Sequence, residues 1–276
     1  MDRRLTPGNS RAALESLRGR VDAPRFTAGD AAQVILPLVD LLDAPGGTRD
    51  RQLLLGEGFT VIDRHEGFAF GQAARDGYCG YLPESALGPA EQATHWVAVP
   101  ASHLYPEPRT QAREIGALSL GARLTVTGAS TGPGGKFAQT TRGFVPENHL
   151  RPLGEWHKDP VAVAQTFLGT PYLWGGNSRA GLDCSGLVQA ALLACGIACP
   201  GDSDLQQSLG KPIADKAPLK RGDLLFWKGH VAMAMNADFM IHATGAFMAV
   251  VAENTKAAIA RIKAAGDGPV IARRRL

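Results

Sequence analysis

The feature that most restricts the fold of this chain is an internal repeat in its first half. The segment VILPLVDLLDAP at 34–45 recurs as VAVPASHLYPEP at 97–108, and GYLPESAL at 80–87 recurs as GFVPENHL at 143–150, both 63 residues later. Each copy has short alternating runs between Gly, Pro and Asp residues, which is typical of short antiparallel strands. The repeat therefore predicts two small all-β barrels in tandem, at 31–90 and 91–153, after an N-terminal segment at 1–30.

The second half of the chain places a cysteine at an expected helix start. Cys184 follows Asp183 in the stretch PYLWGGNSRAGLDCSGLVQ, and the apolar residues behind it recur at helical spacing. Asp183 would then be the N-cap, and the unpaired N–H groups and positive dipole end of the helix favour thiolate over thiol. Thiolates attack carbonyl carbons. The stretch indicates a nucleophile, although a lone cysteine at such a place is otherwise a small buried apolar residue.

Two histidines downstream lie in short apolar runs. His230 opens the run HVAMAMN, and His242 lies within FMIHATG. Bulky apolar runs of this length predict strands, and we expect these two to be adjacent and antiparallel. A helix-start cysteine packed against a sheet with two histidines supplies a nucleophile, a base and a group that orients the base.

Five segments in order, PYLWGG, DCSG, GDLLFW, GHVAM and MIHA, resemble the signature of the NlpC/P60 family of papain-like cell-wall cysteine peptidases. The resemblance implies an α+β catalytic domain at 154–276, with a nucleophile helix packed on an antiparallel sheet. It implies Cys184 as the nucleophile, His230 as the general base and His242 as the orienting third member. Tyr172 would donate to the oxyanion beside the Cys184 N–H. No metal or cofactor is required.

The repeated barrels resemble bacterial SH3 domains, and two of them before such a peptidase resemble the γ-D-glutamyl-L-diamino-acid endopeptidases of murein peptide recycling. This implies a murein peptide substrate with a free N-terminal L-alanine and either meso-diaminopimelate or lysine as the diamino acid. The family has an arginine before its Asp-Ser pair, where this chain has Gly201 and lacks that charge. The implied substrate-binding residues are Asp183, Ser185, Asp202, Ser203, Glu57, Tyr78 and Trp174.

The amino-acid composition excludes some classes of binding partner and some locations. The net charge of +3 over 276 residues, without a basic stripe, predicts no nucleic-acid binding. The polar N-terminus and the lack of a long apolar run predict neither a secretory signal nor a membrane span. Four cysteines without an evident disulfide framework agree with a reducing compartment, so we expect a cytoplasmic protein. The sequence does not indicate the oligomeric state.

Three other functions remain open at this point. The first is a hydrolase of intact peptidoglycan, in which the SH3 domains would bind the cell wall. The second is an amidase or acyltransferase on the same fold, since fold is not function. The third is a peptide-binding protein without catalysis, which the joint presence of Cys184, His230 and His242 argues against.

Overall fold

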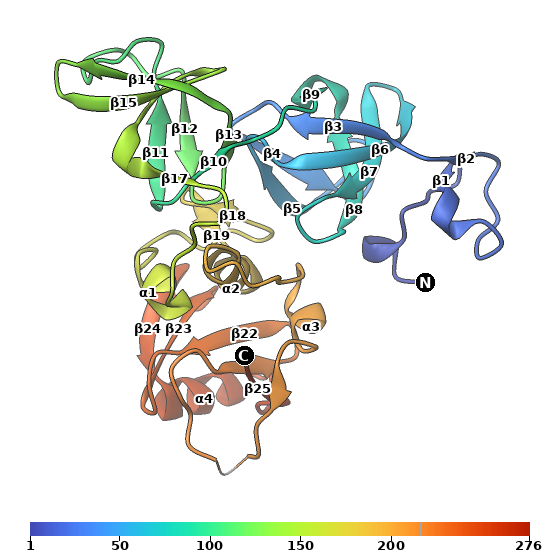
Figure 1. The fold of residues 1–276 in the computed structure, drawn as a ribbon. Helices are drawn as coiled ribbons and strands as arrows, with labels where there is room; N and C mark the ends of the chain where they lie inside the picture. Colours follow the sequence, from blue (N-terminus) through green and yellow to red (C-terminus); the bar gives the residue numbers. More distant parts are fainter. Residues whose placement is uncertain (216) are drawn as a thin grey trace. The chain divides into compact units, whose positions relative to one another are not determined.

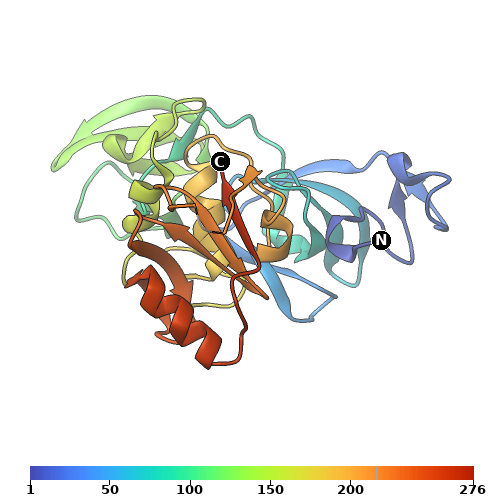
Figure 2. The same cartoon turned by 90° about the horizontal axis from the view of Figure 1, so that it is seen from below.

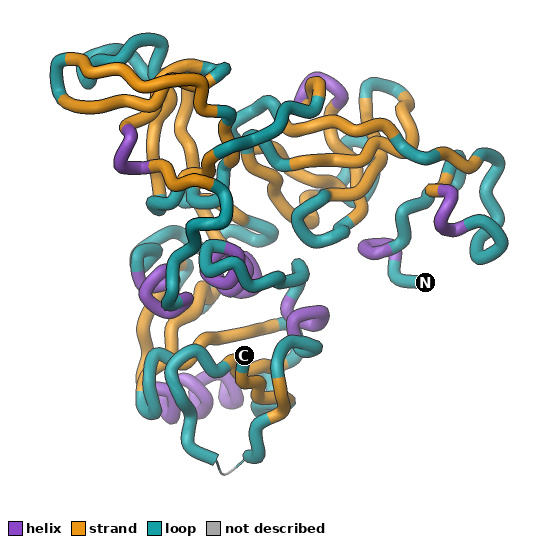
Figure 3. The backbone as a smooth tube through the Cα atoms, in the orientation of Figure 1, coloured by secondary structure: helices purple, strands orange, loops and turns teal. Residues whose placement is uncertain are grey.

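The computed structural model describes residues 1–215 and 217–276. The chain divides into two compact units, Met1–Glu155 and Trp156–Leu276. Strands dominate the first unit, whereas the second combines a sheet with helices, as Figures 1 and 3 show. Within the described residues, no helix has both the length and the apolar character needed to cross a bilayer. The antiparallel sheets and helices confirm the predicted α+β class.

The first barrel is a seven-stranded antiparallel sheet with the strand order β5-β4-β8-β7-β6-β3-β9. Burial alternates along β4 because successive side chains of a strand point to opposite faces. The inward side chains form one core that includes Val34, Leu41, Phe59 and Leu82. The elements are β3 (Asp30–Val34), β4 (Leu38–Leu42), β5 (Arg49–Leu54), β6 (Gly58–His65), β7 (Phe68–Ala73), β8 (Cys79–Pro83), η3 (Glu84–Ala86) and β9 (Leu87–Pro89).

The N-terminal segment is tied to this barrel by ion pairs. Asp63 of β6 is buried and accepts hydrogen bonds from Arg11 at 2.9 Å and Arg25 at 3.2 Å. Arg3 pairs with Asp50 of β5 at 2.6 Å. Figure 2 shows the segment in dark blue beside the barrel. Its elements are η1 (Arg3–Leu5), β1 (Ala13–Leu14), η2 (Glu15–Leu17) and β2 (Phe26–Thr27).

The second barrel repeats the closing elements of the first and shares a core with it. Elements η4 and β17 follow η3 and β9 at the 63-residue offset of the sequence repeat. Leu54 and Leu55 of the first barrel pack with Val97, Leu118 and Val145 of the second. The elements are β10 (His95–Val97), β11 (Ala101–Leu104), β12 (Gly116–Ser119), β13 (Arg123–Leu124), β14 (Val126–Gly132), β15 (Gly135–Thr140), β16 (Gly143–Pro146), η4 (Glu147–His149) and β17 (Leu150–Pro152).

The second unit is built on a six-stranded antiparallel sheet with the order β20-β25-β21-β22-β23-β24. Helix α4 covers one face, where Ala258 and Ile262 pack against Trp227, Ala232 and Met240. Figure 2 shows this helix in red along the sheet. The strands are β20 (Lys211–Pro212), β21 (Leu224–Trp227), β22 (His230–Ala234), β23 (Phe239–Thr244), β24 (Ala249–Asn254) and β25 (Ala272–Arg275), with a separate hairpin of β18 (Asn177–Ser178) and β19 (Gly181–Leu182).

Two local predictions for this unit are confirmed, the helix start at Cys184 and the pairing of the two histidine strands. Helix α2 begins at Cys184, with Asp183 as its N-cap. Strands β22 and β23, which carry the two histidines, are antiparallel neighbours. Ser203 is the first residue of helix α3. The helices are α1 (Pro160–Gln165), α2 (Cys184–Leu193), α3 (Ser203–Gln206) and α4 (Thr255–Ala264).

Candidate active site

Asp183 fixes the start of helix α2 through three hydrogen bonds. Its Oδ1 accepts from the Gly186 N–H at 2.6 Å and from the Ser185 hydroxyl at 2.9 Å, while its Oδ2 accepts from the Gly175 N–H at 2.9 Å. The side chain is buried, so these bonds replace the water that the carboxylate lost on folding. The cap therefore defines the position of Cys184, which is also buried, at the positive end of the helix dipole.

The loop before the cysteine runs close to the first turn of α2. The Leu182 N–H donates to the Pro171 carbonyl at 3.1 Å, and the Leu173 N–H donates to the Leu182 carbonyl at 3.0 Å. A Cβ added at Gly186 would lie 2.2 Å from the carbonyl oxygen of Gly176. Only glycine permits this approach, which explains the Gly residues around the cysteine.

Tyr172 is held in this loop by its backbone N–H, which donates to the Met248 carbonyl at 2.9 Å. Its side chain is half-buried. Burial raises the pKa of its hydroxyl well above the usual value, and the neighbouring charges of Cys184 and Asp183 act in the same direction. The hydroxyl therefore stays protonated at neutral pH and can donate a hydrogen bond.

Cys184 contacts the residue that precedes His230, although the two come from distant segments. The Cys184 thiol donates to the carbonyl of Gly229 at 3.9 Å, and Gly229 directly precedes His230. Gly229 has a φ of +74°, a conformation that favours glycine, and lies in the turn between β21 and β22. The turn thus brings the first residue of β22 to the helix start.

His230 is the first member of a chain of hydrogen-bonded side chains. Its Nε2 lies 2.9 Å from Nδ1 of His242, and Nε2 of His242 lies 2.7 Å from Oε2 of Glu253. Arg261 of α4 donates to both oxygens of Glu253, at 2.5 and 3.2 Å. Because Nε2 of His230 is used in this way, Nδ1 is the ring nitrogen left for the thiol.

Burial decides the charge of the two histidines. It lowers the pKa of His230 to about 3, with His242 and Arg261 acting in the same direction and Glu253 opposing them. Burial also lowers the pKa of His242, whereas the hydrogen bond between its ring and the Glu253 carboxylate acts in the opposite direction. For Glu253 itself, hydrogen bonds from Arg261 and His242 outweigh burial and lower the pKa. At neutral pH the array is two neutral imidazoles and a carboxylate.

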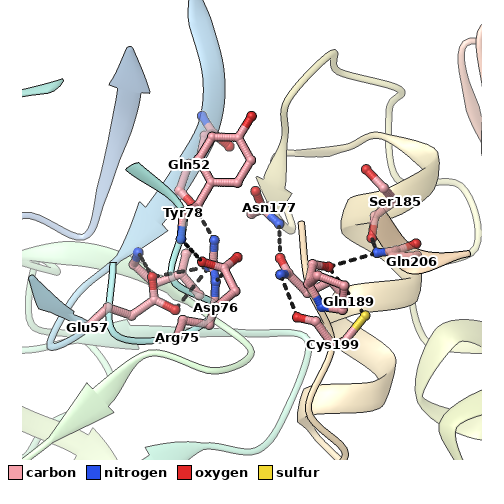
Figure 4. A network of polar contacts seen from close by, with 12 residues as sticks. Gln52, Glu57, Arg75, Asp76, Tyr78, Asn177, Ser185, Gln189, Cys199 and Gln206 are labelled. Carbon is pink, nitrogen blue, oxygen red and sulfur yellow. Dashed lines mark hydrogen bonds and ion pairs between the residues drawn. The ribbon is translucent and has the colours of Figure 1, made fainter. Parts of the chain in front are cut away.

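Asp202 is the N-cap of helix α3, and Ser203 is the first residue of that helix. Helix α3 contacts α2, and Nε2 of Gln206 donates to the carbonyls of Ser185 at 3.0 Å and Pro200 at 3.1 Å, as Figure 4 shows. Ser203 is buried and Asp202 is half-buried. Gln206 therefore joins helix α3 to the residue that follows the cysteine, and the amine-binding role of Asp202 and Ser203 stays a prediction.

Two of the predicted substrate-binding residues belong to the first unit, where Figure 4 shows their surroundings. Glu57 is buried, accepts from the Leu54 N–H at 3.0 Å and forms an ion pair with Arg75 at 3.0 Å. Tyr78 is 2% exposed and belongs to the core of the first barrel, while its N–H donates to Asp76 at 3.1 Å. The contact of Glu57 and Tyr78 with substrate stays a prediction.

Trp174 is exposed, with 69% of its surface accessible to solvent, whereas Glu57 and Tyr78 are buried. Its position two residues after Tyr172 places an uncovered aromatic ring on the loop before the cysteine. Such a ring is suited to contact with a bound ligand. Its substrate-binding role also stays a prediction.

Sequence reasoning did not single out Glu253 and Arg261. Glu253 lies on β24 and Arg261 on α4, and neither belongs to the motifs recognised in the sequence. The available signal was weak: one acidic residue within AVVAEN, a strand that is otherwise largely apolar, with an arginine eight residues later.

Comparison with known families gives two matches. Residues 169–263 match the NlpC/P60 family, and residues 41–87 match the bacterial dipeptidyl-peptidase SH3 domain. The first match covers the cysteine, both histidines and Glu253. The second lies within the first barrel.

Two of the proteins similar in sequence to this chain come from Bacillus species. The chain is 29% identical over 226 residues to the gamma-D-glutamyl-L-lysine dipeptidyl-peptidase of Bacillus cereus, covering 70% of this chain and 66% of that protein. It is 37% identical over 112 residues to the protein of the same name from Bacillus subtilis, covering 36% of this chain and 37% of that protein. The matches thus span just under two thirds of the first relative and about a third of the second.

A solved structure shares the fold. The crystal structure of an NlpC/P60 family protein from Bacillus cereus superimposes with a TM-score of 0.73, covering 89% of this chain and 99% of that one at 22% identity. The similarity includes parts of both units and concerns the fold alone.

Proposed function

This chain belongs to the NlpC/P60 family of cysteine peptidases, and we propose that it hydrolyses the γ-D-glutamyl–diamino acid bond of murein peptides that carry a free N-terminal L-alanine. The diamino acid is meso-diaminopimelate or lysine. The observation that carries the proposal is the meeting of Cys184, through Gly229, with the hydrogen-bonded pair of His230 and His242. The names of the two Bacillus relatives support the choice of bond.

The proposed chemistry is acyl transfer through a thioester. The thiol proton of Cys184 moves to Nδ1 of His230, and the thiolate attacks the γ-carbonyl carbon of D-glutamate. The Tyr172 hydroxyl and the Cys184 backbone N–H donate to the oxyanion of the tetrahedral intermediate. His230 then gives its proton to the amine of the departing diamino acid. Water hydrolyses the thioester, with His230 as the base, and frees the cysteine.

The pKa of about 3 for His230 bears on the first step. A buried imidazole with this pKa is neutral at physiological pH, and in this scheme it takes up a proton only when a thiolate forms beside it. His242 orients His230 in this scheme. His230, as the base, is therefore neutral and ready to accept a proton over the physiological range.

Recognition of the free amine is assigned to acceptor groups near the cysteine. Asp202 and Ser203 are the principal candidates because they begin helix α3, which contacts α2. Asp183 and Ser185 form hydrogen bonds within the helix cap, so they would contribute to amine binding mainly through the charge of the Asp183 carboxylate. Trp174 is proposed to contact the peptide with its exposed ring, and Glu57 and Tyr78 are proposed as further contacts.

A panel of substrates tests this proposal. The purified protein is incubated with L-Ala-γ-D-Glu-meso-diaminopimelate, with the lysine analogue, and with the N-acetylated form of each, and products are identified by mass spectrometry. We expect release of the diamino acid from the free tripeptides and little from the acetylated ones. Equal rates on free and acetylated peptides would refute the amine site. Cleavage of intact peptidoglycan alone would instead support the wall-hydrolase alternative.

A further inference from the structure

We infer that Glu253, held by Arg261, is a positioning residue that fixes the tautomers of His242 and His230 and so presents a free Nδ1 lone pair to Cys184. This inference rests on the proposed roles of Cys184, His230 and His242. The acidic residue and its arginine would thus extend the Cys-His-His arrangement by two members, neither of which touches the substrate.

The sheet register places Glu253 behind His242. In the antiparallel pair of β23 and β24, His242 is opposite Val251 and Met240 is opposite Glu253, so His242 and Glu253 are diagonal neighbours on one face. Such neighbours lie within reach of long side chains. The contact of 2.7 Å between Nε2 of His242 and Oε2 of Glu253 follows from this register.

The position of the carboxylate determines which nitrogen of each histidine ring carries the proton. An ionised carboxylate only accepts hydrogen bonds, so Nε2 of His242 must carry a proton. In a neutral imidazole the other nitrogen, Nδ1, is then an acceptor, and it faces Nε2 of His230 at 2.9 Å. Nε2 of His230 must therefore be the donor, which leaves Nδ1 of His230 unprotonated. That nitrogen is the one that can take the thiol proton.

Arg261 keeps the carboxylate ionised and oriented. Its guanidinium donates to both oxygens of Glu253, at 2.5 Å from Nη2 and at 3.2 Å from Nε. It also lies over the ring of Phe247, 5.2 Å from the centroid, which limits its rotation. The side chain of Glu253 is only 15% exposed, so water competes weakly for these bonds.

The carboxylate also stabilises the charge that appears in catalysis. When the thiol proton moves to Nδ1 of His230, the imidazolium donates through His242 to Glu253, which stays ionised, and no second proton needs to move. Besides burial, the groups that act on the pKa of His230 are His242, Arg261 and Glu253. Without the carboxylate, Arg261 would face His242 as an uncompensated cation and oppose protonation of His230.

The rate of Cys184 alkylation as a function of pH tests the inference without any substrate. Iodoacetamide is added to the full-length protein between pH 5 and 9, and modification is followed by peptide mass mapping. Burial raises the pKa of Cys79 to about 12 and of Cys195 to about 11, so both serve as slow internal references. For Glu253→Ala we expect the Cys184 midpoint to rise by about one pH unit, which lowers reactivity about tenfold below the midpoint.

Two further variants separate positioning from packing. Glu253→Asp keeps the carboxylate, so its midpoint should lie between those of the wild type and Glu253→Ala. Lys263→Ala removes an exposed charge from helix α4, which also carries Arg261, and should leave the midpoint unchanged. Thermal unfolding of each variant shows whether it is folded. A Glu253→Ala protein that is folded and has the wild-type midpoint would overturn the inference.

A measurement on the unmodified protein keeps the inference falsifiable if Glu253→Ala does not fold. Two-bond ¹H–¹⁵N spectra of histidine rings report which nitrogen carries the proton. We expect neutral His230 and His242 that both carry it on Nε2. A proton on Nδ1 of His242 would overturn the inference. If these spectra and the alkylation follow expectation while no murein peptide is cleaved, the proposed function fails and the positioning role stands.

Discussion

Replacement of Asp183 by alanine would remove the cap that holds Cys184 in place. The carboxylate accepts three hydrogen bonds, two of them from the backbone N–H groups of Gly175 and Gly186. Loss of an N-cap costs about 0.5–2 kcal/mol. Leaving the buried Gly175 N–H without a partner adds about 1–3 kcal/mol. We therefore expect Asp183→Ala to lower the free energy of unfolding of the second unit by about 1.5–5 kcal/mol.

The matched control is Ser185→Ala, which removes one hydroxyl donor to the same carboxylate but leaves both backbone contacts. Its expected cost is about 1 kcal/mol. Urea unfolding followed by tryptophan fluorescence, together with hydrogen exchange of the α2 amides, gives both values. If Asp183→Ala costs no more than Ser185→Ala, the carboxylate does not stabilise the helix start, and the structural argument for its position is wrong.

Three other predictions concern the site. Tyr172→Phe should lower kcat about 10²–10³-fold with little change in KM, since one oxyanion donor is lost; an unchanged kcat would exclude that role. Gly186→Ala places a Cβ 2.2 Å from the Gly176 carbonyl and should cost about 1–3 kcal/mol, whereas Gly245→Ala meets no atom within 4 Å and should cost far less. His230 binds a proton below about pH 6.5 in the unfolded chain, but only near pH 3 in the folded chain. The free energy of unfolding should thus fall as the pH drops between these values, by up to about 1.4 kcal/mol per pH unit, and His230→Gln should flatten that slope in urea titrations.

The local parts of the fold were predictable because their signals are local. The helix start at Cys184 and the strands of His230 and His242 are encoded by short apolar runs, a capping residue and glycines. The repeated closing elements η3–β9 and η4–β17 were predictable because the closing segment recurs 63 residues later. The shared core of Leu54 and Val97 was not, since it depends on how two barrels meet.

The outer part of the site was not predictable for the same reason. Glu253 reaches His242 through the register of β23 and β24, and Arg261 reaches Glu253 from the following helix. Neither spacing has a distinctive pattern in sequence. The pairing of Glu57 with Arg75 was likewise not predictable, because the two residues are 18 positions apart, with strands β6 and β7 between them.

Cys184 as the nucleophile that cleaves the γ-D-glutamyl bond is the central claim, and one experiment tests it most directly. Wild-type protein and Cys184→Ala are incubated side by side with L-Ala-γ-D-Glu-meso-diaminopimelate, and products are followed by mass spectrometry. We expect L-Ala-D-Glu and free diaminopimelate from the wild type and neither from the variant. Equal hydrolysis by Cys184→Ala, or release of L-alanine in place of the diamino acid, would contradict the account.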